Sequence, residues 1–271
     1  MKDAVTKRLD RDKDVLRLEP QIVGRFYDDA NRLGQRSARA GKPRYYRPER
    51  WIGSSTMAVN PKGIPSGGVS PWADAPASGP KLLPELLRHA EHGPRLLGGK
   101  RFNKHDGELR LLLKLLDAGI PIPFHVHAND KFVSDHPNVY PDQRFGKDEA
   151  YHFLTAPKGP QPYTHVGLHK GVRARDIVEQ MERGVDYVLE TSPAVYQEYG
   201  CGFYTKAGLM HRPGTALNLE VQQPSDVYTF FQKEFGNVTL SAADRHPGFT
   251  DAMKATAVID FRLNHDPKLI E

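Results

Sequence analysis

The sequence predicts a mainly β protein, a jelly-roll barrel with an N-terminal helical extension and a few short helices. Two observations support this fold class. Proline and glycine are frequent, with 22 and 24 residues in a chain of 271. Turn-forming residues recur at intervals of roughly eight to twelve positions, between short segments in which apolar and polar residues alternate. A chain of this length forms one large domain, with at most a small appendage.

Composition narrows the class of protein further. Hydrophobic residues make up 38% of the chain and the mean hydropathy is −0.59, so we expect a soluble protein with a full core. No run of about eighteen apolar residues predicts a transmembrane helix, and the mixed charges of Met1–Ala4 do not resemble a signal peptide. The single Cys201 excludes an internal disulfide and fits a reducing compartment. We therefore expect a cytoplasmic protein with no membrane partner.

The first part of the chain is interpreted as helical. Apolar residues recur there among charges at rough helical spacing, at Val15, Leu16, Leu18, Ile22, Phe26 and Leu33. This spacing predicts an extension over residues 1–45 that packs outside a barrel domain of residues 46–271. The net charge of +5 is concentrated between Arg32 and Arg50. A solvated arm explains this excess better than contact with nucleic acid, for which no motif is present.

Short strands dominate the rest of the prediction. The apolar run 109–116 fits a buried strand or a short helix, and Lys114 inside it needs an anion, a cavity or an exposed edge for its ammonium group. Residues 119–153 are expected to hold two strands around a polar loop. Helices are expected at residues 84–91 and 175–183, with Pro84 in a first helical turn. Further strands are expected at 51–59, 164–168, 195–199, 202–204, 216–221, 227–231 and 256–261.

Two histidines form the most informative local pattern. His125 and His127 are two residues apart in an apolar segment, so a β-strand would place both imidazoles on one face, within reach of one metal ion. Glu149 begins a second alternating segment, and His211 follows a Gly-containing turn downstream. Three imidazoles and one carboxylate suit zinc, iron, manganese or nickel. The alternative is a pair of surface or hydrogen-bonded histidines, since the chain has 12 in all.

Several segments together resemble a known family, the type I phosphomannose isomerases, which are metal-dependent members of the cupin superfamily. The resemblance covers roughly residues 50–262. The segments that carry it, in the family's order, are Leu113–Ala118, Phe124-His125-Val126-His127, Phe145-Gly146-Lys147-Asp148-Glu149, Val166–Gly171, Ala207-Gly208-Leu209-Met210-His211 and Leu219–Asp226.

The resemblance implies metal ligands at His127, Glu149 and His211, with His125 at the position of the family's fourth ligand, a glutamine. Zinc is the family's expected metal, and the additional imidazole also suits Fe²⁺, Mn²⁺ or Ni²⁺. Lys147 and Glu220 match polar residues of the family's sugar pocket. Lys114 matches a family lysine, which implies a substrate-binding role.

The sequence also departs from the family in three ways. Phe230 stands where the family has a catalytic arginine, and Pro123 stands where it has a substrate-binding serine. Arginine is well suited to bidentate phosphate contacts and phenylalanine cannot replace it, so the substrate is expected to differ from a phosphorylated hexose. The family's second, C-terminal barrel is expected to be absent or rudimentary.

These observations favour a metal-dependent aldose–ketose isomerase that acts on a sugar or sugar phosphate, with a non-phosphorylated sugar as the altered substrate. Such an enzyme moves a proton between adjacent carbons, and Glu220 and Lys147 are the candidate catalytic residues. Two alternatives remain open. One is another metal-cupin enzyme, an oxygenase or a lyase, and the other is a non-catalytic cupin that binds a sugar or a metal. The sequence leaves the oligomeric state open.

Overall fold

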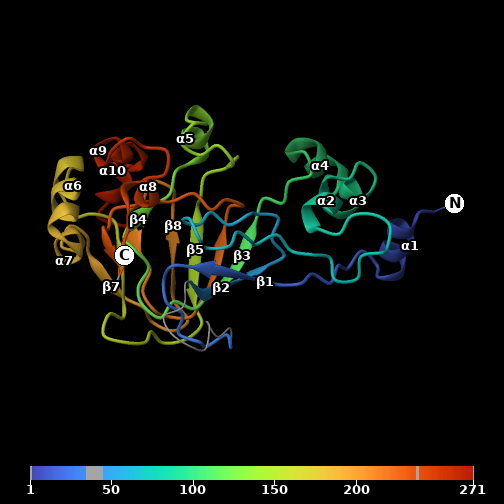
Figure 1. Ribbon diagram of the computed structural model, residues 1–271, viewed down its shortest axis with the longest axis horizontal. Helices are drawn as coiled ribbons and strands as arrows, with labels where there is room; N and C mark the ends of the chain where they lie inside the picture. Colours follow the sequence, from blue (N-terminus) through green and yellow to red (C-terminus); the bar gives the residue numbers. More distant parts are fainter. Residues whose placement is uncertain (1, 35–44, 236–237, 271) are drawn as a thin grey trace.

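The computed structural model describes residues 2–34, 45–235 and 238–270, which form mainly antiparallel β-sheets with short helices (Figure 1). The larger sheet has six strands in the order β1-β2-β3-β10-β5-β8, and the second has five in the order β11-β4-β9-β6-β7. The strands of these sheets are β1 Gln21–Arg25, β2 Tyr46–Ile52, β3 Leu112–Leu116, β4 His125–Val126, β5 Glu149–Phe153, β6 Tyr163–Val166, β7 Ala194–Tyr196, β8 Gly202–Thr205, β9 His211–Arg212, β10 Asn218–Gln222 and β11 Thr229–Phe230. The predicted mainly β, jelly-roll fold class is confirmed.

The six-stranded sheet places a row of polar side chains on its inner face. In β3, β5 and β10 alternate residues are buried, as period-2 strands with one face on a core require. Antiparallel pairing aligns Glu220 of β10 with Lys114 of β3 on one side and with Tyr151 of β5 on the other. The run 109–116, which fitted a strand or a helix, contains strand β3, and Lys114 faces inward.

The five-stranded sheet carries most of the predicted metal-binding histidines. His125 of β4 pairs directly with His211 of β9. The apolar side chains around this sheet belong to the largest buried cluster, which includes Phe124 and Val126 and also Ile177 and Met181 of helix α6 (Ala174–Arg183). Helix α6 coincides with the helix expected at residues 175–183. Helices α7 (Val185–Leu189), α8 (Ala242–Arg245), α9 (Ala252–Ala255) and α10 (Phe261–Asn264) lie on the same side of the molecule (Figure 1).

The expected helical extension is wrong over much of its length. Helix α1 spans only Ala4–Arg11, whereas β1 joins the main sheet by antiparallel pairing with β2. The reason is that Val23 and Arg25 are buried together with Tyr27, a period-2 pattern that the charge of Arg25 conceals. Arg32, expected in a solvated arm, instead binds Asp117. Residues 35–44, next to the expected boundary at residue 45, lie outside the described residues, and the two-part division stays a prediction.

A small helical lobe lies beside the main sheet, at the N-terminal end of the molecule (Figure 1). It contains α1, α2 (Leu83–Arg88), α3 (His92–Leu97) and α4 (Gly99–His105). Val5 and Leu9 of α1 and Leu86 of α2 form a separate buried cluster with Trp72, and Leu96 of α3 packs against it. Helix α2 confirms the short helix expected at 84–91, with Pro84 in its first turn. Helices α3 and α4 were not predicted, because Pro94 and a glycine-rich segment interrupt the apolar spacing.

Three further expectations need correction. The strand expected at 51–59 is β2, which ends at Ile52 because Gly53 turns the chain with φ +60°. The strand expected at 256–261 is instead the 3₁₀ turn Thr256–Val258 followed by α10, which Asp260 caps through the amide of Leu263. The polar loop before Glu149 contains helix α5 (Asp130–Asp135), capped by Asn129. A short hairpin of β12 (Glu234–Phe235) and β13 (Val238–Thr239) was also unexpected.

No helix among the described residues is long and apolar enough to cross a membrane.

Candidate metal centre and adjoining pocket

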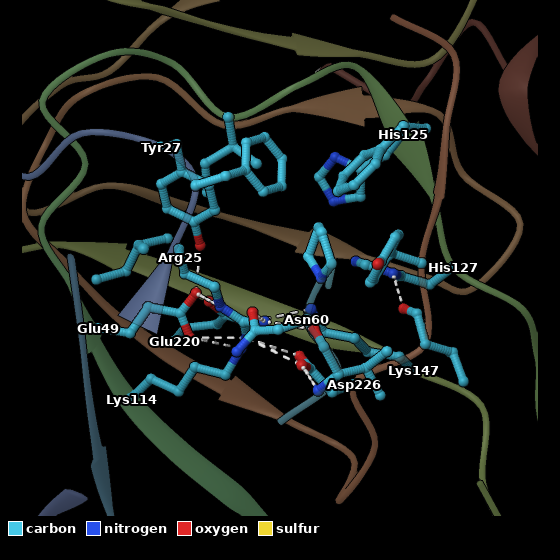
Figure 2. A pocket seen from close by; sticks show the side chains of 18 of the residues that line it. Arg25, Tyr27, Glu49, Asn60, Lys114, His125, His127, Lys147, Glu220 and Asp226 are labelled. Atoms are coloured by element: carbon cyan, nitrogen blue, oxygen red, sulfur yellow. Dashed lines mark hydrogen bonds and ion pairs between the residues drawn. The ribbon is translucent and has the colours of Figure 1, made fainter. Parts of the chain in front are cut away.

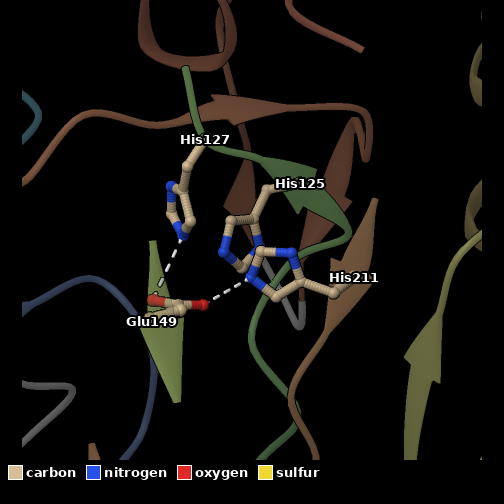
Figure 3. Close-up of side chains that lie close together, drawn as sticks. All are labelled: His125, His127, Glu149 and His211. Carbon is tan, nitrogen blue, oxygen red and sulfur yellow. Dashed lines mark ion pairs between the residues drawn. The ribbon is translucent and has the colours of Figure 1, made fainter. Parts of the chain in front are cut away.

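Four predicted ligand residues meet where the two sheets face each other (Figure 3). His125 and His211 come from β4 and β9, His127 directly follows β4, and Glu149 opens β5. Each offers one ligand atom within 4.8 Å of the others, and each side chain is at most 4% exposed. The structure therefore brings together the whole predicted set from segments that are far apart in the sequence.

Backbone carbonyls orient all three imidazoles. Nδ1 of His125 lies 2.6 Å from the carbonyl of Pro123, Nδ1 of His127 lies 2.7 Å from that of Val227, and Nδ1 of His211 lies 2.9 Å from that of Leu209. A carbonyl only accepts, so each Nδ1 carries the proton and each Nε2 is left with a free lone pair. Metal-binding histidines usually receive this second contact, which fixes the tautomer and the ring direction.

The buried atoms of this cluster lack hydrogen-bond partners. Among the described residues, Nε2 of His127 and Nε2 of His211 are inaccessible to solvent and make no hydrogen bond, and Oε2 of Glu149 has only the ammonium of Lys147 as an ion-pair partner, at 2.9 Å. Nε2 of His211 nevertheless lies 2.8 Å from Oε1 of Glu149, and Nε2 of His127 lies 3.4 Å from Oε2. With the protons on Nδ1, each of these contacts brings the lone pair of an Nε2 atom against a carboxylate oxygen of Glu149. Two acceptors repel each other unless a cation lies between them. The donor set therefore fits a divalent metal ion, which the four residues could hold.

The electrostatic environment keeps these groups in the form that binds metal. Burial, followed by the charge of Lys147, lowers the pKa of His127 to about 3. Burial also places the pKa of His125 well below its ordinary value. Burial alone would raise the pKa of Glu149, but Lys147 and the neighbouring imidazoles outweigh it and hold this pKa well below the usual range. The imidazoles of His125 and His127 are thus neutral and the carboxylate of Glu149 is charged at physiological pH.

Two lysines and a second carboxylate line a pocket together with His125 and His127 (Figure 2). Nζ of Lys147 lies 2.9 Å from Oε2 of Glu149 and 3.5 Å from Oε1 of Glu220. The same oxygen of Glu220 accepts a hydrogen bond from Nζ of Lys114 at 3.2 Å. All three predicted pocket residues are therefore buried in one chain of contacts that ends at Glu149. Lys147 lies in the loop that leads into β5.

The structure adds a group of buried residues that sequence reasoning missed. Glu49 of β2 accepts hydrogen bonds from Nε and Nη2 of Arg25 at 2.7 and 3.2 Å, from Nε1 of Trp51 at 2.6 Å and from the hydroxyl of Tyr27. Arg25 also binds Asp226 at 3.0 Å. Among these residues, only the charged ones that stand inside apolar segments could have indicated this group from the sequence. A charge in a buried segment requires a partner.

These residues surround a cavity next to the ligand cluster. Its volume is about 50 Å³, and its lining includes Arg25, Lys114, His127, Glu220 and Phe230. Phe230 stands at the position where the family that the sequence resembles has an arginine. Its ring centroid lies 5.7 Å from that of His125, and its ring stacks on Tyr228 with the centroids 4.4 Å apart. Pro123 does not line the cavity, and its carbonyl orients His125. One wall of the cavity is therefore aromatic at the position where that family has a cation.

Comparison with known proteins identifies the fold. Neither a family model nor a curated protein matches the sequence. Among solved structures, the chain is similar to the mannose 6-phosphate isomerase from Bacillus subtilis, with 21% identity and a TM-score of 0.63, covering 90% of this chain and 68% of that one. It is also similar to a mutant of phosphomannose isomerase from Salmonella typhimurium, with 16% identity and a TM-score of 0.58, covering 94% and 76%. The fold and the site thus define a mainly β protein. It has the fold of these isomerases and a buried cluster that could hold a metal ion.

Proposed function

We propose that the chain is a metal-dependent aldose–ketose isomerase whose substrate is a non-phosphorylated sugar. One observation carries the proposal: a buried carboxylate, Glu220, lies between two lysines, and one of these, Lys147, also contacts the ligand residue Glu149. This arrangement provides a base, two cations and a metal site in one pocket. An aldose–ketose isomerisation needs these groups to move a proton and to stabilise an enediolate.

Zinc is the proposed ion, held by His125, His127, Glu149 and His211, which provide the nitrogen and oxygen donors that zinc prefers. When bound, the ion supplies Lewis-acid polarisation of the sugar oxygens. The free thiol of Cys201 is compatible with the cytoplasmic location expected from composition.

Glu220 is the proposed general base. Burial raises its pKa, and the nearby carboxylates Glu149 and Glu49 add to this, although Lys114 and Lys147 oppose them. A carboxylate with a raised pKa is a better proton acceptor near neutral pH than an ordinary glutamate. Its position on β10, opposite Lys114 and Tyr151, holds the carboxylate towards the cavity.

The two lysines have different proposed roles. The carboxylates of Glu149 and Glu220 raise the pKa of Lys147 despite its burial, so it stays cationic and can stabilise a developing oxyanion. Lys114 binds Glu220 and stands 3.7 Å from Oε2 of Glu49 and 5.1 Å from the ring centroid of Trp51. This framework positions Lys114 to bind a sugar hydroxyl beside the base.

The charge balance of the pocket favours a neutral sugar. Among the described residues that line the cavity, each cation already contacts carboxylates: Arg25 binds Glu49 and Asp226, Lys114 lies near Glu49 and Glu220, and Lys147 lies near Glu149 and Glu220. A substrate phosphate would have to compete with these buried pairs. Phe230 offers only an apolar ring where an arginine could have bound phosphate.

The cavity must enlarge before a sugar can bind. Its volume of about 50 Å³ suits a few water molecules rather than a hexose. Val59 and Asn60 separate it from a second cavity of about 470 Å³. Arg25 donates to the carbonyl of Val59 at 2.9 Å and to Oδ1 of Asn60 at 3.1 Å. We infer that the sugar reaches the pocket when this segment moves away from Arg25.

A paired screen tests the proposal. Metal-loaded protein is incubated in D₂O with free aldoses and with their 6-phosphates, and ketose formation and deuterium at C1 of the ketose are followed by NMR. We expect turnover of a free aldose, and a reduction of kcat by about 10²- to 10⁴-fold in Glu220→Gln, which keeps its metal. Glu198→Gln, a change at an exposed carboxylate away from the pocket, serves as the matched control and keeps full activity.

The alternative outcomes separate the remaining readings. Preference for a 6-phosphate would refute the neutral substrate and retain the isomerase. Full metal occupancy without turnover of any sugar would leave a non-catalytic binding protein. Bound iron with consumption of dioxygen would instead identify an oxygenase.

A further inference from the structure

Arg212 is a buried cation on the side of β9 opposite the ligand cluster. It directly follows His211, and consecutive residues of a strand point to opposite faces. The side chain of His211 belongs to the ligand cluster, whereas Arg212 lines a separate cavity. Only 5% of Arg212 is exposed. One short strand therefore contributes a residue to each of two sites.

Arg212 lacks an anionic partner within the part of the chain that the structure describes. Its Nη2 donates to Oε1 of Gln161 at 3.0 Å, and its buried Nε makes no hydrogen bond. The residue paired with it on β6 is His165, not a carboxylate. A guanidinium has five N–H donors and stays charged in proteins. A buried charge with one neutral contact is unfavourable and requires compensation by an anion.

The cavity beside Arg212 has room for a small ligand. Its volume is about 350 Å³, within the usual range for ligand pockets. The lining comes from the loops around Ile120 and Gln161, from β12 and from the start of α7. Helix α7 lies on the same side of the molecule as β7 (Figure 1). Lys158 adds a second cation, and Thr215 and Gln232 add polar groups.

Two carboxylates also line this cavity and could in principle neutralise Arg212. Asp186 opens α7 and Glu234 lies on β12, and both side chains are exposed to solvent. Among the described residues neither forms an ion pair with Arg212, although burial lowers the pKa of Arg212 and the charge of Asp186 opposes this. Exposed carboxylates are screened by water and compensate a buried charge poorly.

We propose that this cavity binds a small oxyanion, a phosphate or carboxylate group, which Arg212 holds in a bidentate contact. The amino hydrogens that Gln161 does not bind can form a planar fork that matches two oxygens of such a group. Lys158 provides the second charge at the cavity wall. This site is separate from the sugar pocket, and its existence does not depend on the proposed isomerase activity.

Titration calorimetry with the metal-loaded protein tests the site, with inorganic phosphate and acetate as probes and sodium chloride at the same ionic strength as the reference. We expect wild type to bind at least one probe, and Arg212→Met to bind it at least tenfold more weakly. Arg183→Met removes the same charge from an exposed arginine of α6 and should bind like wild type. The better probe identifies the anion class. No binding by wild type, or equal binding by Arg212→Met, would overturn the proposal.

A second variant separates the ligand site from an internal ion pair. If Asp186 swings in to neutralise Arg212, Asp186→Asn should lower the melting temperature and leave anion binding absent or unchanged, which would contradict the proposal. If the cavity is an anion site, Asp186→Asn removes a competing negative charge and should tighten binding of the better probe about threefold or more. Circular dichroism of each variant confirms that it is folded.

Discussion

Glu49 provides the sharpest test of the buried charge network. Its two oxygens accept four hydrogen bonds, from Arg25 twice, from Trp51 and from Tyr27, and Oε2 also lies 3.7 Å from Nζ of Lys114. Burial alone would raise the pKa of Glu49, but Arg25 and Lys114 reverse this and lower it well below its usual value. The group is therefore a buried anion at neutral pH, and its charge balances two buried cations.

Glu49→Gln keeps the size of this side chain and removes its charge. In either orientation the new amide group faces N–H donors, because Nε of Arg25 lies at Oε1 and both Nη2 of Arg25 and Nε1 of Trp51 lie at Oε2. Each buried group left unpaired costs about 1–3 kcal/mol, and breaking a buried ion pair costs about 3–5 kcal/mol. We therefore expect the free energy of unfolding to fall by about 3–5 kcal/mol, and Tm to fall by roughly 6–20 °C.

Urea denaturation followed by circular dichroism measures this change, with Asp135→Asn as the matched control. Asp135 makes an exposed ion pair with Lys131, and its side chain is 49% exposed, so the same carboxylate-to-amide change should lower stability by less than about 1 kcal/mol. If Glu49→Gln were as mild as this control, Arg25 and Lys114 would not depend on Glu49, and the reasoning about the network would be wrong.

Three further predictions concern groups outside this network. Tyr151→Phe removes the hydroxyl that donates to Glu149 and should weaken zinc binding about 10- to 100-fold in a competition titration while the fold is kept; unchanged affinity would contradict it. Burial, followed by Arg245, lowers the pKa of His246 from 6.5 to about 4. Stability is therefore present above pH 6.5 and is lost as the pH falls towards 4, and wild type should lose about 2 kcal/mol more than His246→Gln between pH 7 and pH 5. Parallel urea curves for the two proteins would refute this shift. A Cβ on Gly202 would lie 1.8 Å from the carbonyl oxygen of Tyr151, so Gly202→Ala should cost about 1–3 kcal/mol in urea unfolding, and a neutral effect would show that β8 shifts freely.

The sequence predicted the strands whose burial follows a simple local pattern. Alternation from Glu149 to Phe153 reported the inner face correctly, because this strand has one face on the core. The apolar run around Lys114 left strand and helix open, and the structure shows a strand. It also predicted the four residues that meet in the ligand cluster, since their types and spacing carry the signal. Whether these residues bind metal, and whether Glu220 and Lys147 are catalytic, stay predictions.

Other features depend on partners that no local pattern reveals. β1 was interpreted as helix because its buried Arg25 looks like a surface residue until Glu49 and Asp226 are placed beside it. The carbonyl contacts that orient the imidazoles come from the backbone, which has no residue signature. The unpaired charge of Arg212 is likewise visible only once the strands around it are assembled.

Metal content tests the central claim most directly. Elemental analysis of the purified protein should give about one equivalent of a divalent metal for wild type, and little or none for His127→Ala and His211→Ala. His152→Ala, at the exposed position of β5 that faces away from the cluster, should keep full occupancy. Full occupancy in both His127→Ala and His211→Ala would show that the cluster is not a metal site, and this result would contradict the proposed metal-dependent isomerase.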